Sequence, residues 1–275
     1  LPRFYMEAWK MEVHSLASGS SGNAYIILHQ GRALLLDAGL SGKRTYAGLA
    51  AAGIDPASIT AILVTHEHND HIAGAGILSR RLGIPLYMTA GTWLGAKGKL
   101  GNIPEDKIKL ISPGTAFALN GLEVWALPVC HDALEPVNYI FDTGKCRAAV
   151  LTDTGCVTAA IVNTLAACNA MVLEANHDPE MLQHGPYPRA LKQRVASENG
   201  HLSNLQAARV LAGLAAKGKI TQAHLGHLSA VNNSPEIAIS AVAQFLAAQG
   251  MDSEPVYHSL QVLPRHKLGP VLQVK

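Results

Sequence analysis

The sequence lacks any apolar run long enough to span a membrane. No uninterrupted stretch reaches the about 18 residues that a bilayer requires. Residues 1–10 contain an acidic residue and no apolar segment of the kind found in secretory signals. We therefore expect a soluble, cytoplasmic protein that is not exported and has no membrane partner.

Cysteine is scarce, and no two cysteines have the C-x-x-C spacing of redox or zinc motifs. A chain of 275 residues buries enough apolar surface to need no covalent cross-links. We expect reduced thiols that pack as small buried side chains at the four positions Cys130, Cys146, Cys156 and Cys168.

Charged residues make up only 15% of the chain and hydrophobic residues 48%, which excludes disorder as the dominant state. The 22 basic and 20 acidic residues leave a net charge of +2, too near zero to indicate a nucleic-acid partner by itself. At this length we expect one domain over residues 1–275, with a core from about 12 to about 262.

Histidine, in contrast, is abundant. The chain has 13 histidines, where about six would be expected from average composition. The excess indicates metal or proton chemistry.

Short apolar runs alternate with amphipathic stretches along the whole chain. Ser203 is the expected N-cap of one helix and Gly218 its end. Two strand-rich blocks, each accompanied by helices, do not fit a simple doubly wound sheet and predict two sheets packed face to face with helices outside. The predicted strands are Ala24–Leu28, Ala33–Asp37, Ala61–Thr65, Leu122–Leu127, Tyr139–Asp142, Ala148–Asp153, Ala170–Glu174 and Ile220–Leu225, and the predicted helices are Lys43–Ala52, His71–Leu82, Thr158–Ala167, Arg189–Ser197, Ser203–Ala216 and Pro235–Gln249.

Four potential metal ligands follow directly on the strand at 61–65. In an extended segment alternate residues share a face, so His66, His68 and Asp70 point together, while His71 turns away at the start of the next helix. Imidazole combined with carboxylate favours Zn²⁺, Mn²⁺ or Fe²⁺ over Ca²⁺ or Mg²⁺, which prefer oxygen ligands.

Four residues do not complete two metal sites, and three later strand ends offer the rest. His131, Asp153 and His227 each stand where a predicted strand stops. A single histidine at a strand end is more often an ordinary hydrogen-bonded residue. Three such residues beside the histidine cluster favour metal binding.

The motif T-H-E-H-N-D-H at residues 65–71, followed by single His, Asp and His residues at strand ends, resembles the metallo-β-lactamase superfamily from about Glu12 to Val262. The resemblance implies an α/β fold that is a four-layer αββα sandwich. It also implies two divalent ions, Zn²⁺ or Mn²⁺, the first held by His66, His68 and His131, the second by Asp70, His71 and His227, and both bridged by Asp153.

A second resemblance concerns Glu174 and His201, where Gly200-His201-Leu202-Ser203 opens a helix. The pair is similar to the acidic residue and the helix-start histidine of the tRNase Z family, which implies that it protonates the leaving oxygen. Together with Asp70, these residues are the implied catalytic group. The alternatives are a helix-capping histidine and a structural carboxylate.

Within the superfamily the chain resembles the YycJ (WalJ) group of single-domain nucleases. The Gly/Ser-rich loop could line the phosphate side of the cleft, which makes Ser18, Ser20 and Asn23 candidate substrate-binding residues, although such a loop can also be a simple hairpin turn. The motifs that carry the resemblance are Ser15–Asn23, His131-Asp132-Ala133, Glu174–Asp178, Gly200–Asn204, and His227-Leu228-Ser229 with Asn232-Asn233.

These observations favour a dinuclear metal-dependent phosphodiesterase, a nuclease or exonuclease on DNA or RNA in which metal-activated hydroxide attacks phosphorus. Two ions bound by few carboxylates leave a net positive centre, which suits a phosphodiester but does not exclude a thioester. The alternatives are a thioester or β-lactam hydrolase on the same metals, and a binding module that retains only the fold. A nucleic-acid partner is expected, and a homodimer is left open.

Overall fold

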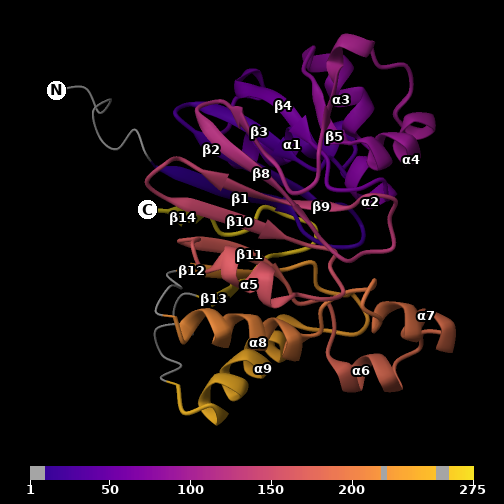
Figure 1. Ribbon diagram of the computed structural model, residues 1–275. Helices are drawn as coiled ribbons and strands as arrows, with labels where there is room; N and C mark the ends of the chain where they lie inside the picture. Colours follow the sequence, from indigo (N-terminus) through magenta and orange to yellow (C-terminus); the bar gives the residue numbers. More distant parts are fainter. Residues whose placement is uncertain (1–9, 218–221, 252–259) are drawn as a thin grey trace.

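The computed structural model describes residues 10–217, 222–251 and 260–275. Two seven-stranded sheets lie face to face, and helices cover the outer face of each, as Figure 1 shows. The expected αββα sandwich is therefore confirmed. Among the described residues, no helix is both long and apolar enough to cross a membrane.

The first sheet mixes antiparallel strands on one side with parallel strands on the other. Helices α1 (Gly42–Ala51), α2 (Asn69–Ile72), α3 (Ala75–Leu82) and α4 (Ala90–Leu100) belong to this half of the molecule. The strands run in the order β14 (Leu272–Val274), β1 (Met11–Ala17), β2 (Ala24–His29), β3 (Arg32–Leu36), β4 (Ile59–Leu63), β5 (Leu86–Thr89) and β6 (Ile108–Ile111).

The second sheet has a parallel half, formed by its first four strands, and an antiparallel half. Its strands run in the order β13 (Leu260–Val262), β12 (Gln222–Gly226), β11 (Ala170–Glu174), β10 (Arg147–Leu151), β9 (Val137–Asp142), β8 (Leu122–Pro128) and β7 (Ala116–Leu119). Its helices are α5 (Ala159–Leu165), α6 (Pro179–His184), α7 (Arg189–Val195), α8 (Asn204–Ala215) and α9 (Pro235–Ala248).

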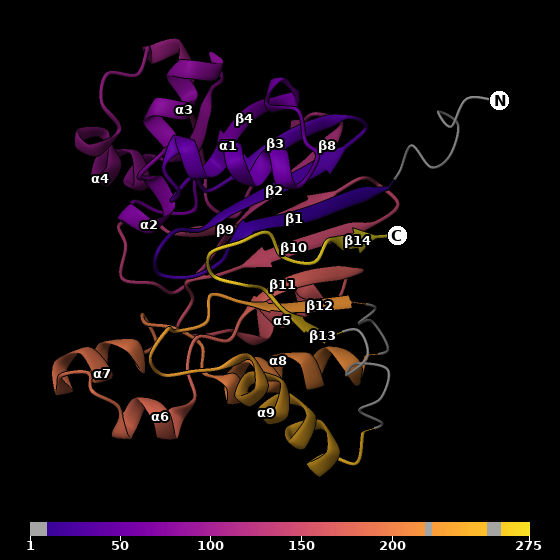
Figure 2. The same cartoon turned by 180° about the vertical axis from the view of Figure 1, so that it is seen from behind.

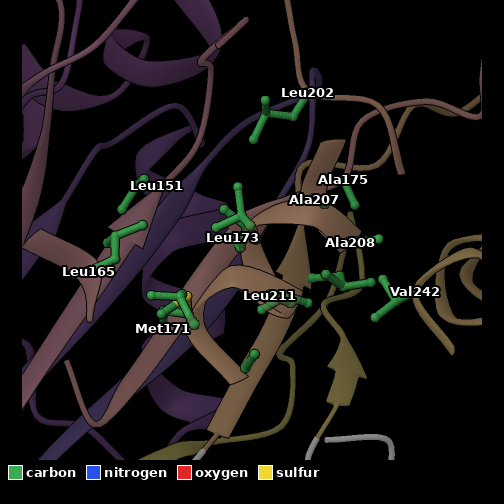
Figure 3. Packing of buried hydrophobic residues seen from close by; sticks show 14 of the residues in the cluster. Leu151, Leu165, Met171, Leu173, Ala175, Leu202, Ala207, Ala208, Leu211 and Val242 are labelled. Carbon is green, nitrogen blue, oxygen red and sulfur yellow. The ribbon is translucent and has the colours of Figure 1, made fainter. Parts of the chain in front are cut away.

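Three apolar layers hold the sandwich together, one between the sheets and one under the helices of each outer face. Figure 3 shows the layer in which Leu211 of α8 lies near Met171 and Leu173 of β11. Helix α8 begins as predicted, because the hydroxyl of Ser203 accepts from the N–H of Gln206 and the Gln206 side chain accepts from the N–H of Ser203.

Every predicted strand has a counterpart in the structure, with boundaries shifted by a few residues. Residues 220–221 of one predicted strand, and the predicted helix end Gly218, lie outside the described residues. The sequence reading missed β1, β5, β6, β7, β13 and β14 together with α4 and α6. Most of these elements have three or four residues, too few for a periodicity to stand out, and β1 carries polar residues such as Glu12 and His14.

The predicted helix His71–Leu82 is instead two helices, α2 and α3, separated near Gly74. The N–H of Gly74 donates to the carbonyl of Ala38, and a Cβ at this position would lie 2.1 Å from the carbonyl oxygen of Leu40. Only glycine lets the chain approach the segment after β3 this closely. That close approach keeps α2 against the end of the first sheet.

Two of the four cysteines, Cys146 and Cys168, are buried as expected. The expectation is wrong for Cys130 and Cys156, which are partly exposed, because both stand in loops after strand ends rather than within the sheets. All four are free thiols.

Candidate metal centre and active site

Residues after the ends of several strands of both sheets converge at one edge of the sandwich. Asp37, Asp153 and His227 follow β3, β10 and β12, and each has a positive φ, of 56°, 53° and 54° respectively. A non-glycine residue rarely adopts this left-handed conformation, and such residues cluster at functional sites. The turn that each one makes directs its side chain across the edge instead of along the strand.

The first group of ligand atoms belongs to His66, His68 and His131, all within 4.8 Å of one another. Nδ1 of His68 and Nε2 of His131 are 3.3 Å apart. Two imidazole lone pairs repel at this distance unless a cation or a proton lies between them. The geometry therefore fits a positive ion.

The second group of ligand atoms belongs to Asp70, His71 and His227, also within 4.8 Å of one another. Asp153 lies between the two groups: its carboxylate oxygens are 2.9 Å from Nε2 of His71 and 4.0 Å from Nε2 of His131. The structure thus brings together all seven residues that the resemblance implied as ligands. Two further groups of ligand atoms lie equally close, one of His66, His71 and Asp153 and one of Asp153, Glu174, His201 and His227.

The Nδ1 atoms of two proposed ligands, His71 and His131, lie beside oxygen atoms that can accept a hydrogen bond. Nδ1 of His71 is 2.7 Å from the carboxylate of Asp37, and Nδ1 of His131 is 3.1 Å from the carbonyl oxygen of Gly200. Carboxylates and carbonyls in this position fix the tautomer of a metal-binding histidine and leave Nε2 for the ion.

The remaining ring nitrogens provide a direct test of whether a metal fits. Nε2 of His66 and Nε2 of His227 are buried and have no hydrogen-bond partner among the described residues. A buried polar atom without a partner is costly, so native structures rarely leave one. Divalent ions at the two groups would satisfy both atoms, and the donor set suits them chemically.

The charges of the buried carboxylates also favour bound cations. Burial alone would raise the pKa of Asp153, but the adjacent His227 and His71 outweigh it and hold this pKa well below its usual range. Burial alone would lower the pKa of His227, but Asp153, Asp70 and Glu174 raise it to about 10. The carboxylates thus need positive charge beside them, and bound divalent ions supply it.

Glu174 is fully buried and connects the metal groups to His201. One oxygen of its carboxylate lies 2.8 Å from Nδ1 of His201 and 2.9 Å from Nδ1 of His227, and the other accepts from the N–H of Thr154. Burial opposes a charge on His201, but the carboxylates of Glu174 and Asp153 outweigh it and raise the pKa of this histidine. His201 can therefore hold a proton beside the site near neutral pH.

The loop at residues 18–23 differs from what we expected of it. Ser18 and Asn23, predicted to bind substrate, are fully buried and do not line the cavity. The Ser18 hydroxyl accepts from the N–H of His227 at 2.8 Å, and Asn23 lies against Asp70 and His71. The structure places both side chains against proposed ligands and away from the cavity, because the loop packs under the site with its polar groups facing inward.

Only Ser20 of the three predicted loop residues reaches the cavity beside the metal ligands, which has a volume of about 220 Å³. A Cβ on Gly39 would lie 1.6 Å from the carbonyl oxygen of Asp70, so glycine is required where the segment after β3 contacts Asp70. The cavity is lined by Ser20, His68, Asp70, Asp153, Asn176, Tyr187, Leu191, Arg194, Val195, His201, His227 and Ser229.

Sequence reasoning missed several residues of this site. Asp37 ends a predicted strand, so the argument applied to Asp153 could have found it. Tyr187 and Leu191 gave no comparable signal, because they lie in and before a short helix far from the ligand motifs. Only the folded chain brings them to the cavity.

Comparison with known proteins shows the family and the fold of the chain. Residues 32–224 match the model of the β-lactamase superfamily domain. The chain is 40% identical over 235 residues to the exodeoxyribonuclease YycJ of Bacillus anthracis, covering 86% of this chain and 89% of that protein. It is 37% identical over 235 residues to the exodeoxyribonuclease WalJ of Streptococcus pneumoniae, covering 84% and 87%.

Among solved structures, the metallo-β-lactamase fold protein YhfI from Bacillus subtilis superposes with a TM-score of 0.70. The alignment covers 96% of this chain and 99% of that one, at 15% sequence identity. At this identity the likeness concerns the fold.

Proposed function

The chain belongs to the β-lactamase superfamily and has the metallo-β-lactamase fold. We propose that it is a dinuclear metal-dependent phosphodiesterase that degrades nucleic acid as an exonuclease. The observation that carries the proposal is the pair of three-ligand groups with Asp153 between them and Glu174–His201 beside them. The names of the relatives favour DNA as the substrate.

We assign His66, His68 and His131 to one divalent ion, Asp70, His71 and His227 to the other, and Asp153 to both. When bound, the ions supply an activated water and stabilise negative charge on the phosphoryl oxygens. We propose Zn²⁺ or Mn²⁺, because imidazole and carboxylate together suit either ion.

The chain's own residues complete the chemistry. His201, held at Nδ1 by Glu174, presents a proton to the departing sugar oxygen, which is a poor leaving group without protonation. Glu174 also holds Nδ1 of His227, so one carboxylate orients both the proton donor and a ligand.

We further propose that this is a cytoplasmic, single-domain protein. The possible homodimer is left open.

The test is digestion of end-labelled DNA and RNA, single- and double-stranded, by protein stripped of metal and reloaded with Zn²⁺ or Mn²⁺. A glutathione thioester and a β-lactam are assayed beside them. We expect metal-dependent release of nucleotides from DNA ends, faster than any turnover of the other two substrate classes. Faster hydrolysis of the thioester or the lactam would refute the proposal, and protein that takes up no metal would favour the binding module.

A further inference from the structure

Beside the metal groups, the cavity has a second wall, formed by the segment that carries α6 and α7. This segment joins β11 to α8 and projects beyond the sheet edge in Figures 1 and 2. Tyr187, Leu191 and Arg194 from it line the same cavity as Asp70 and Asp153. None of the three has a part in the metal chemistry.

From this juxtaposition we propose a nucleotide subsite in which Tyr187 and Leu191 hold an unpaired base and Arg194 binds the phosphate next to the one that is cleaved. The inference rests on the proposed nuclease function and adds the residues that recognise the substrate strand. The expected occupant is the end of a single DNA strand, because a base must be unpaired to expose its face for stacking.

Tyr187 is suited to stacking. It is partly exposed and stands between Pro186 and Pro188, whose rings restrict the backbone on both sides. An aromatic ring presented on a stiff segment loses little conformational entropy when a base stacks on it. Leu191 lies in the first turn of α7, where it extends the apolar side of the same cavity wall.

Arg194 is suited to a phosphate. Leu191 and Arg194 are three residues apart in α7, so both face the cavity. The side chain of Arg194 is 52% exposed, and its Nε donates to Asp132, its only hydrogen-bond partner in the described part of the chain. The guanidinium has further N–H groups, in a planar fork that matches two phosphate oxygens.

Asp132 places this guanidinium relative to the metal groups. One oxygen of Asp132 accepts from Arg194, and the other lies 3.3 Å from Nε2 of His131. A single carboxylate thus separates Arg194 from a proposed metal ligand. Arg194 therefore stands where a phosphate adjoining the metal-bound one would pass.

The charge of the helix supports an anionic occupant. Helix α7 contains Arg189, Lys192 and Arg194 and no acidic residue. Arg189 is exposed on the same helix but does not line the cavity, so it provides a matched control for Arg194.

The test compares metal-loaded wild type with Tyr187→Ala, Tyr187→Phe, Arg194→Ala and Arg189→Ala. The substrates are a single-stranded oligonucleotide, the same oligonucleotide with an abasic terminal residue, and methyl p-nitrophenyl phosphate as a diester without a base. Metal content and thermal unfolding of each variant are measured first, to confirm folded, loaded protein.

We expect the wild type to cleave the oligonucleotide with a terminal base about tenfold or more faster, in kcat/KM, than the abasic one. Tyr187→Ala should abolish this ratio, and Tyr187→Phe should keep it. Arg194→Ala should raise KM for the oligonucleotide about tenfold and weaken the dependence of this KM on salt concentration. Arg189→Ala should do neither. Arg189→Ala should turn over the small diester at the wild-type rate, and the rates of the other three variants on this diester are used to correct their oligonucleotide rates for any change at the metal groups.

An unchanged base-to-abasic ratio in Tyr187→Ala, or equal effects of Arg194→Ala and Arg189→Ala, would overturn the subsite while leaving the nuclease intact. A wild type that hydrolyses the small diester but neither oligonucleotide would overturn the proposed function and the subsite with it. The two failures are therefore distinguishable.

Discussion

The carboxylate of Asp37 lies 2.7 Å from Nδ1 of His71, and both side chains are fully buried. The same carboxylate accepts hydrogen bonds from the N–H and the hydroxyl of Thr65, whose own hydroxyl is 2.9 Å from Nδ1 of His66. One residue of the first sheet thus orients proposed ligands of both ions. We therefore expect the arrangement of the proposed metal ligands to depend on this contact.

Replacing Asp37 by Asn tests that dependence. Asparagine keeps the shape and tolerates the left-handed φ at this position, but it lacks the negative charge. We expect metal affinity to fall about 10- to 100-fold, with activity recovering at high metal concentration. Titration against a chelating dye measures the change, and Asp55→Asn, on an exposed helix cap, should bind metal normally. Wild-type affinity in Asp37→Asn would contradict the assigned role.

Replacing Asp153 by Ala removes the anion between the two groups. Metal content should fall from two ions per chain toward one, and phosphodiester turnover by several orders of magnitude. Elemental analysis and an activity assay measure the two effects. Asp142→Ala, which breaks an ion pair with Arg147 at the end of β9, should keep both ions. Full occupancy and near-normal activity in Asp153→Ala would show that the ligand assignment is wrong.

Replacing His201 by Ala separates a proton donor from a ligand. Both ions should stay bound, and a substrate with an alkoxide leaving group should react roughly 10²-fold or more slowly. A p-nitrophenolate leaving group needs little protonation, so that substrate should lose much less. Equal losses on both substrates, together with depleted metal, would make His201 a ligand instead.

Replacing Ser18 by Ala tests whether this residue positions His227 or binds substrate. The substitution leaves the buried N–H of His227 and the hydroxyl of Tyr25 without their partner. We expect a loss of about 1–3 kcal/mol in the free energy of unfolding and little change in KM. Ser20→Ala, at the cavity, should show the opposite pattern. A raised KM with full stability in Ser18→Ala would support the expectation that Ser18 binds substrate.

Buried His224 in β12 predicts acid sensitivity of the fold. Burial lowers the pKa of His224 to about 4, against 6.5 when it is exposed. Between these values the unfolded chain binds more protons, so stability is complete above about pH 6.5 and is lost as pH falls toward 4. Denaturant unfolding measures the free energy of unfolding at pH 8 and at pH 5. The loss of this free energy between the two pH values should be about 2 kcal/mol larger in wild type than in His224→Leu.

Exposed His184 provides the control for this measurement. His184→Leu should keep the wild-type dependence of unfolding free energy on pH. If His224→Leu also keeps it, the acid sensitivity has another source.

Much of the site could be predicted because its chemistry is local. His66, His68, Asp70 and His71 stand within six residues after a strand, so residue type and spacing define a metal motif without any tertiary contact. The expectation that Asp70 shares a face with His66 and His68 is wrong, because Asp70 and His71 lie in α2 and group with His227. The capping box at Ser203 and Gln206 is local in the same way. Element order was enough to indicate two sheets, since two strand-rich blocks, each accompanied by helices, do not fit a single doubly wound sheet.

Other features required the folded chain. Ser18 meets His227 across 209 positions of sequence, and Arg194 meets Asp132 across 62. No periodicity records such a contact, because it depends on which strand ends share an edge and how the loops between them pack. By itself the sequence determined the ligand types and the layer architecture. The tertiary structure decided which polar residues face inward to hold the ligands and which face the cavity.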